Sequence, residues 1–194
     1  MTTLLLVRHG ETEWNRDGRF QGHADPPLSE RGREQASALA AELAATPLAA
    51  VYSSDLRRAV ETAQIVATAK GLAVRALPEL REVDVGEWAG LTWEEIERRF
   101  PEGVVRHHER GHGWEHGKSY EQMACRVLRA LRGIGVRHPR DAVLVVGHGG
   151  TMRAIAAYID RMDVANHRRH DGSRVLNCEV RRIAIENGVL RRMS

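Results

Sequence analysis

The sequence has few cysteines and no long apolar run. Of its 194 residues only 2 are cysteines, Cys125 and Cys178, which lie far apart and lack the CxxC spacing of metal and redox motifs. Two free thiols in a reducing compartment are the simplest interpretation. No apolar run approaches the roughly 20 residues that a membrane span requires, and the stretch 4–7 is too short for a signal peptide. We therefore expect a cytoplasmic protein with no membrane partner.

Lysine is also scarce, because it occurs only at Lys70 and Lys118, so that almost all of the 29 basic residues are arginines. The 26 acidic residues leave a formal net charge of only +3. Nucleic-acid-binding proteins concentrate positive charge on one face and interleave it with aromatic residues. The arginine pairs at 181–182 and 191–192 have no such aromatics. We expect no nucleic-acid partner.

Apolar β-prone segments alternate with helical patterns along the chain, whose hydrophobic content of 42% is typical of a globular protein. Strands are expected at 3–7, 48–53, 72–77 and 142–147, and helices at 29–45, 55–70, 92–100, 119–137 and 151–159. Ser29 and Asp55 are suitable N-caps. We expect a long loop over 102–117. Asn187-Gly188 between two alternating segments predicts a type I′ β-hairpin at the C-terminus.

This order of elements predicts an α/β fold with three α/β/α layers. The sheet is expected to be mainly parallel, with helices on both faces and the hairpin at one edge. We expect a single domain, 1–194, with a small cap-like subdomain inserted at about 80–117.

Polar residues follow each expected strand, and the carboxyl ends of parallel strands are where open α/β sheets bind ligands. The two histidines and the arginines among them make a poor metal site, because cations repel a metal ion. They suit a phosphate dianion, since arginine forks match its oxygens and helix N-termini add amide donors. One imidazole can attack phosphorus, the other can donate hydrogen bonds, and a glutamic acid can protonate the leaving alcohol. The residues are Arg8, His9, Gly10 and Glu11, then Ser54, Asp55, Arg57 and Arg58, then Arg81 and Glu82, and finally His148, Gly149, Gly150 and Thr151.

Several motifs occur in the order found in a known family. RHGET (8–12), Asn15, GRFQG (18–22) and LSERG (28–32) resemble the opening of the histidine phosphatase superfamily, in its phosphoglycerate-mutase-like branch (branch 1). SDLRRA (54–59), LRE (80–82), GEWAG (86–90) and VGHGG (146–150) resemble its later motifs. The resemblance covers essentially the whole chain.

The resemblance implies a role for each matching residue. His9 becomes transiently phosphorylated, and the phosphoryl group is bound by Arg8, Arg58 and His148, with Asn15 beside them. Glu82 protonates the leaving group and then activates water, although Asp84 and Glu87 lie close in sequence. Gln21, Gly22 and Gly149 contact the substrate. No metal or other cofactor is implied. Gly10 is interpreted as the residue that lets the backbone turn beside the imidazole.

Both phosphatases and mutases of this family use a phosphohistidine. The mutases carry an insertion after the position of Glu82, whereas the segment 83–101 is the shorter, phosphatase-like form. We therefore expect a phosphatase acting on small phosphomonoesters, with a phosphoglycerate mutase-type phosphotransferase as the alternative. A non-enzymatic phosphate- or nucleic-acid-binding module is less favoured, because His9, Arg8 and His148 are all present. The physiological substrate, residual mutase activity and the oligomeric state, including a possible homodimer, stay open.

Three further features stay open. Lys118 stands where family members often have glutamate, so it either favours a more acidic substrate or is a solvated residue before a helix. His107, His108, His112 and His116 have suggestive spacings, but neighbouring glycines break any helix that would align them as metal ligands. Protonation near pH 6 is their other possible role, in tuning substrate attraction. Trp88, Trp93 and Trp114 either line the substrate pocket or, more typically, form a small core.

Overall fold

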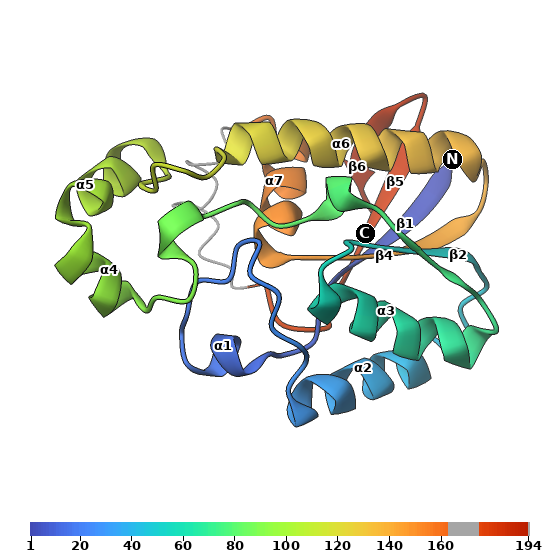
Figure 1. Cartoon of the computed structure of the whole chain (residues 1–194). Coiled ribbons are helices and arrows are strands. Elements are labelled where there is room, and N and C mark those ends of the chain that lie inside the picture. The colour runs from blue at the N-terminus through green and yellow to red at the C-terminus, as the bar shows by residue number, and fades with distance from the viewer. Residues whose placement is uncertain (163–174, 194) are drawn as a thin grey trace.

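The computed structural model describes residues 1–162 and 175–193. Its centre is a six-stranded sheet with the order β3-β2-β4-β1-β5-β6 (Figure 1). The strands from β3 to β1 are parallel, and β5 and β6 are antiparallel to their neighbours. The mainly parallel sheet with a C-terminal hairpin is therefore confirmed. The strands are β1 Thr2–Arg8, β2 Leu48–Ser53, β3 Val74–Ala76, β4 Ala142–Gly147, β5 Val180–Glu186 and β6 Val189–Arg192.

Helices cover both faces of the sheet, as expected for three layers (Figure 1). Side chains alternate along β1, so Leu5 and Val7 pack with α2 (Glu30–Glu42) and α3 (Arg57–Lys70). Leu4 and Leu6 pack on the other face with α6 (Tyr120–Arg137) and α7 (Gly149–Ile159). Burial on both faces explains why β1 is a continuous apolar run.

The hairpin turn has the backbone conformation that its sequence predicts. Asn187 and Gly188 both have positive φ, 49° and 76°, as a type I′ turn requires. This turn joins β5 to β6 and places β6 at the edge of the sheet.

Four predicted boundaries are wrong. Helix α2 ends at Glu42, three residues before the predicted end at residue 45. Helix α3 begins at Arg57 after Leu56, not under an Asp55 cap, because the Asp55 carboxylate accepts two hydrogen bonds from Arg81, at 2.7 and 2.6 Å. Strand β3 starts at Val74 rather than at residue 72, because the N–H of Leu72 closes the end of α3 on the carbonyl of Ala67. Helix α7 starts at Gly149, two residues before the predicted start.

The region 80–117 contains more helix than expected. Helix α4 (Trp93–Arg99) begins with the Thr92 capping box. Helix α5 (Pro101–Arg110) replaces most of the loop expected over 102–117, so that prediction is wrong. Pro101 starts the helix and Gly111, with φ of 82°, ends it. Figure 1 shows α4 and α5 at one end of the molecule, beyond the carboxyl ends of β1 and β4.

The tryptophans of this region form a small core. Trp88 and Trp114 are 0% and 5% exposed, and their ring centroids lie 5.5 Å apart with the rings nearly perpendicular. Trp93 and His107 pack against the same Trp88 ring. The aromatic cluster thus holds α4, α5 and the following segment together.

Candidate active site

The two strand-end histidines lie side by side. Strands β1 and β4 are in parallel register with Arg8 opposite Gly147, and the N–H of His9 donates to the carbonyl of Gly147 at 3.0 Å. His9 and His148 therefore extend from the same edge of the sheet. Their ring centroids are 5.2 Å apart, at an angle of 62°.

His9 is held in one tautomer. Its Nδ1 lies 2.7 Å from the carbonyl oxygen of Gly10, and because a carbonyl only accepts, Nδ1 carries the proton. Nε2 is then the unprotonated nitrogen, and it accepts a hydrogen bond from Nε of Arg58 at 3.3 Å. The side chain is buried, and the pKa of His9 is lowered well below its usual value by burial and by Arg58 and Arg8. A neutral imidazole with a lone pair on Nε2 is the form of histidine that acts as a nucleophile.

Gly10 has a different role from the one expected. Its φ is not positive, so no unusual turn requires glycine there. Instead, a Cβ on Gly10 would lie 2.4 Å from the carbonyl oxygen of Gly32 in α2. The glycine allows a close approach between the segment after β1 and this helix. Its N–H donates to Thr62 Oγ1 on α3, which fixes the segment from a second side.

Arg58 extends from the first turn of α3 and is 1% exposed. Its terminal nitrogens donate to the carbonyls of Ala24 and Gly22, at 2.7 and 2.9 Å. Burial lowers the pKa of Arg58 to about 10, partly offset by Glu82 and Asp25, so the guanidinium stays charged at neutral pH. Gly22, with φ of 50°, is expected to contact substrate, and in the structure its carbonyl also holds Arg58.

His148 is fully buried, and neither ring nitrogen has a hydrogen-bond partner in the described part of the chain. Its pKa is lowered well below the usual value by burial, by Arg58, and by His9 and Arg8. Buried polar atoms without a partner are uncommon in native proteins. The His148 ring can therefore offer a hydrogen bond to a ligand beside His9.

Glu82 lies in the segment after the short 3₁₀ helix η1 (Pro78–Leu80), and its side chain extends to the start of α7, next to His148. Its Oε2 accepts from the N–H of Gly150 at 2.8 Å and its Oε1 from that of Val83 at 2.9 Å. The two rival carboxylates are engaged elsewhere: Asp84 accepts from the N–H of Gly86, and Glu87 from that of Glu115. Of these three carboxylates, only that of Glu82 lines the cavity beside His9.

These side chains surround a cavity of about 180 Å³. It brings together all of the residues to which the family resemblance assigns a role except His148, which lies next to His9. The other strand-end candidates do not line it: Gly10, Glu11, Ser54, Asp55, Arg57, Arg81, Gly150 and Thr151. Gln21 contributes a buried Oε1 that has no hydrogen-bond partner among the described residues. The predicted residues in the lining are Arg8, His9, Asn15, Gln21, Gly22, Arg58, Glu82 and Gly149.

Other residues at the site were not predicted. Arg153 lines the cavity from the second turn of α7, and Tyr120 from the start of α6; Arg19, Phe20, Val83 and Val85 complete the lining. Arg153 makes no hydrogen bond or ion pair with the described residues. Asn177, just before β5, donates to the carbonyl of His9 at 2.8 Å. Spacing on α7 could have indicated Arg153, which lies four residues after Gly149 and hence on the same helix face.

Neither Lys118 nor the histidine cluster 107–116 reaches this cavity. Lys118 is absent from the lining, and its backbone bonds to Asp84 and Trp114. His107 stacks within the aromatic cluster, and His116 lies beside Glu87 at the surface. Within residues 1–162 and 175–193, no group of three or more His, Cys, Asp or Glu side chains is arranged to hold a metal ion.

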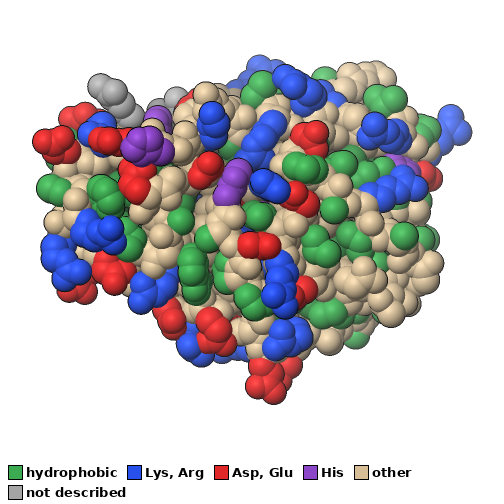
Figure 2. Space-filling view, in the orientation of Figure 1, with side chains coloured by type: hydrophobic (Ala, Val, Ile, Leu, Met, Phe, Trp, Pro, Cys, Tyr) green, Lys and Arg blue, Asp and Glu red, His purple; other side chains and the backbone are tan. Residues whose placement is uncertain are grey.

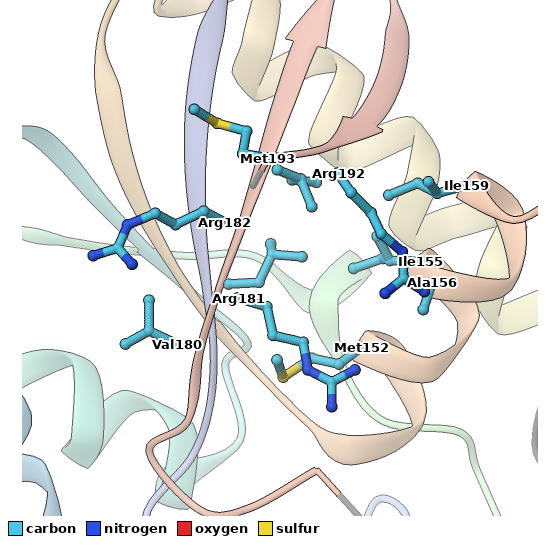
Figure 3. Close-up of a pocket in the computed structure, with 11 residues that line it drawn as sticks. Met152, Ile155, Ala156, Ile159, Val180, Arg181, Arg182, Arg192 and Met193 are labelled. Atoms are coloured by element: carbon cyan, nitrogen blue, oxygen red, sulfur yellow. The ribbon is translucent and has the colours of Figure 1, made fainter. Parts of the chain in front are cut away.

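A second cavity, of about 380 Å³, lies between α7 and the terminal hairpin (Figure 3). Its described lining is apolar apart from three arginines and contains no histidine or carboxylate. Arg181 and Arg192 are bound by Glu179 and Asp160, and Arg182 extends away from α7 (Figure 3). The larger cavity therefore lacks groups for acid–base or nucleophilic chemistry.

Acidic and basic side chains are interspersed over the face of the molecule shown in Figure 2. No single sign of charge dominates this face.

In the described part of the chain, no helix is both long and apolar enough to cross a lipid bilayer.

Comparison with known proteins agrees with the geometry. The family model of the histidine phosphatase superfamily (branch 1) matches residues 4–192, and the chain belongs to this superfamily. Phosphoserine phosphatase 1 of Hydrogenobacter thermophilus is 41% identical over 167 residues, which cover 85% of this chain and 79% of the relative.

Two solved structures show the same fold. Bacillus stearothermophilus YhfR has a TM-score of 0.90 and 32% identity, with 99% of this chain and 95% of that chain covered. The mycobacterial glucosyl-3-phosphoglycerate phosphatase Rv2419c, in its VO3 complex, has a TM-score of 0.85 and 30% identity, with 97% and 95% covered. With phosphatases among these relatives, the chain is a phosphomonoester hydrolase of the histidine phosphatase type, and the mutase alternative is less favoured.

Proposed function

We propose that the chain hydrolyses small phosphomonoesters in two steps through a phosphohistidine on His9, without a metal ion. The observation that carries the proposal is the state of His9. Its Nδ1–H is bound to the carbonyl of Gly10, which leaves Nε2 unprotonated beside Arg58 in the cavity. Charged donors beside a nucleophile suit attack on a dianion, whose charge they offset.

In the first step the phosphate lies between Arg8, Arg58 and His148, with Asn15 beside it. His9 Nε2 forms a bond to phosphorus while the bond from phosphorus to the leaving oxygen breaks. Glu82, in its protonated form, gives its proton to that oxygen. The product alcohol then leaves the site.

In the second step a water molecule attacks the phosphohistidine. The carboxylate of Glu82 accepts the proton of the water, and the bond between phosphorus and Nε2 breaks. Inorganic phosphate is released and His9 returns to its starting tautomer. Glu82 thus acts first as acid and then as base, which its two backbone hydrogen bonds support by keeping the carboxylate in one place.

For the substrate we propose a compact phosphomonoester that carries a carboxylate. Arg153 lines the cavity with a half-buried guanidinium, and an arginine fork matches a carboxylate. Its Nη1 lies 3.4 Å from where a Cβ on Gly149 would sit, and Arg8 Nε lies 3.7 Å from the same point. A carboxylate at Arg153 would thus be a few ångströms from the phosphate. Phosphoserine and glucosyl-3-phosphoglycerate, the substrates in the names of two relatives, are carboxylated phosphate esters.

Trapping the intermediate tests this mechanism. Brief reaction with a 32P-labelled phosphomonoester should leave acid-labile, base-stable label on the protein. His9→Asn should abolish both label and turnover, whereas His116→Asn, at a side chain that is 84% exposed, should change neither. EDTA should leave turnover unaffected. Substantial turnover by a folded His9→Asn protein would overturn the proposal.

A further inference from the structure

We propose that Arg126 is a positioning residue for the reaction: it fixes the backbone that carries Glu82 and so sets where the proton donor lies. The inference rests on the proposed role of Glu82. Arg126 extends from α6 and donates three hydrogen bonds to backbone carbonyls, from Nη1 to Glu79 at 2.8 Å and to Arg81 at 2.6 Å, and from Nη2 to Glu82 at 2.5 Å. It does not line the cavity.

These carbonyls lie where regular structure ends. The 3₁₀ helix η1 stops at Leu80, and the chain continues without a helix or strand until Gly86. Carbonyls at a helix end have no partner within the helix and need donors from elsewhere. The planar fork of one arginine supplies donors to three of them at fixed relative positions. The segment is thereby attached to α6, which packs against the sheet.

Arg126 is half-buried, which is unusual for an arginine that only contributes to a solvated surface. Burial lowers its pKa, and the negative charge of Glu82 opposes this shift. A cation is therefore kept in a partly desolvated position next to the acid of the reaction. His23 also contacts the Glu82 carbonyl, at 2.9 Å through Nε2, so this carbonyl keeps one partner when Arg126 is replaced.

The consequence for catalysis is geometric. The Glu82 carboxylate accepts a hydrogen bond from the N–H of Gly150 on α7. The position of the Glu82 backbone decides whether this carboxylate lies within hydrogen-bond distance of the leaving oxygen. Proton donation depends on hydrogen-bond distance to that oxygen, and displacement by about 1 Å can cost 10²-fold in rate. Replacing Arg126 should therefore weaken proton donation and leave phosphate binding in place.

The leaving group separates this role from simple stabilisation of the loop. An alkyl phosphate such as phosphoserine needs a proton on its departing oxygen, whereas p-nitrophenolate leaves without one. We expect Arg126→Met to lower kcat/KM for phosphoserine about 10- to 100-fold and for p-nitrophenyl phosphate less than about 3-fold. kcat/KM reports only the steps up to phosphorylation of His9, so the later attack of water does not blur the comparison. Inhibition by inorganic phosphate should be unchanged.

Three further variants complete the experiment. Arg126→Lys keeps a hydrogen-bond donor, so it should show a smaller preference for p-nitrophenyl phosphate than Arg126→Met. It also provides the test if the methionine variant does not fold. Arg129→Met, at an exposed arginine on the same helix, should behave as wild type. Glu82→Gln should show the full leaving-group effect, and Arg126→Met should add little to it, because both act on one proton transfer.

Equal loss on both substrates in the Arg126 variants, or a loss that adds to that of Glu82→Gln, would show that Arg126 only stabilises the loop. If Glu82→Gln itself has no leaving-group effect, the proposed role of Glu82 fails. The two failures are therefore distinguishable.

Discussion

The carboxylate of Glu82 accepts a hydrogen bond from the backbone N–H of Gly150 at 2.8 Å. This bond joins the segment after β3 to the first turn of α7, the helix that follows His148 directly. Glu82 and His148 are thus held at the start of the same helix, although they come from distant parts of the chain. Gly150 makes the contact possible, because it has no side chain between the helix and the carboxylate.

Gly150→Ala should displace the acid. The new Cβ would lie 2.1 Å from Glu82 Oε1, so the carboxylate must move. We expect kcat/KM for an alkyl phosphate to fall about 10²-fold, the lower end of what general acid catalysis contributes. Steady-state kinetics with phosphoserine and p-nitrophenyl phosphate would measure it. Gly133→Ala on α6, where a Cβ has no neighbour within 3.4 Å, is the matched control and should keep wild-type kinetics. Unchanged kinetics in Gly150→Ala would contradict the placement of Glu82.

Arg153→Met should discriminate between two substrates that differ by one carboxylate. If Arg153 binds that group, kcat/KM for phosphoserine should fall about 10- to 100-fold, as for loss of a hydrogen-bonded charged group. kcat/KM for phosphoethanolamine, which lacks the carboxylate, should change less than about 3-fold. Equal losses on both would place Arg153 at the phosphate instead, and Arg129→Met again provides the control.

The buried histidines should make stability depend on pH. Their pKa values are lowered in the folded protein, whereas unfolded histidine titrates at about 6.5. Between the folded and unfolded values the unfolded chain binds more protons, so the free energy of unfolding falls as pH drops below about 6.5. Each histidine adds a slope of up to about 1.4 kcal/mol per pH unit.

His148→Asn removes one of these groups, so its free energy of unfolding should fall less steeply with decreasing pH than that of wild type. Urea unfolding of both proteins between pH 5 and 8 measures the difference. Parallel curves for variant and wild type would mean that the pKa of His148 in the folded protein is not lowered.

Inorganic phosphate should stabilise the folded protein. A ligand at 100 times its Kd adds about 2.7 kcal/mol to the free energy of unfolding, and Arg8, Arg58 and His148 are the groups expected to bind it. The midpoint temperature of thermal unfolding should rise when phosphate is added to wild type and should hardly change in Arg58→Met. Sodium chloride at equal ionic strength controls for general salt effects. An equal shift in the variant would remove Arg58 from the anion site.

Strands β2 and β4 and the capped helices could be predicted closely from the sequence, because short apolar runs and capping residues mark them locally. Helix α5 could not. Its glycine looks like a helix breaker, but a Cβ on Gly103 would lie 2.8 Å from the carbonyl oxygen of Gly113. The helix depends on close packing with the following segment and with the aromatic cluster, and both are tertiary contacts that no local pattern reveals.

The residues of the site also divide into those that a local pattern predicts and those that only tertiary contacts bring into place. His9, Arg58 and His148 could be predicted because a topological rule brings strand ends together. Arg126 and Asn177 could not, since one lies inside a helix and the other in a connection, where only the three-dimensional arrangement brings them to the backbone of Glu82 and His9. Arg153 could be indicated only by its spacing from Gly149 on α7. The residues proposed to surround the phosphate are thus encoded locally, and those proposed to orient Glu82 are encoded by packing.

The pairing of β1 with β4 and β5 has a consequence for how the enzyme gains its activity during folding. The proposed nucleophile His9 directly follows strand β1, yet Arg8 pairs with Gly147, about 140 residues later, and Val7 with Val180. Contacts so distant in sequence form slowly, because a long loop must close first. During synthesis on the ribosome, His9 emerges early but has no neighbouring strand until β4 and β5 follow. Catalytic competence is therefore a late event, and recovery of activity on refolding should report the insertion of β1 into the centre of the sheet.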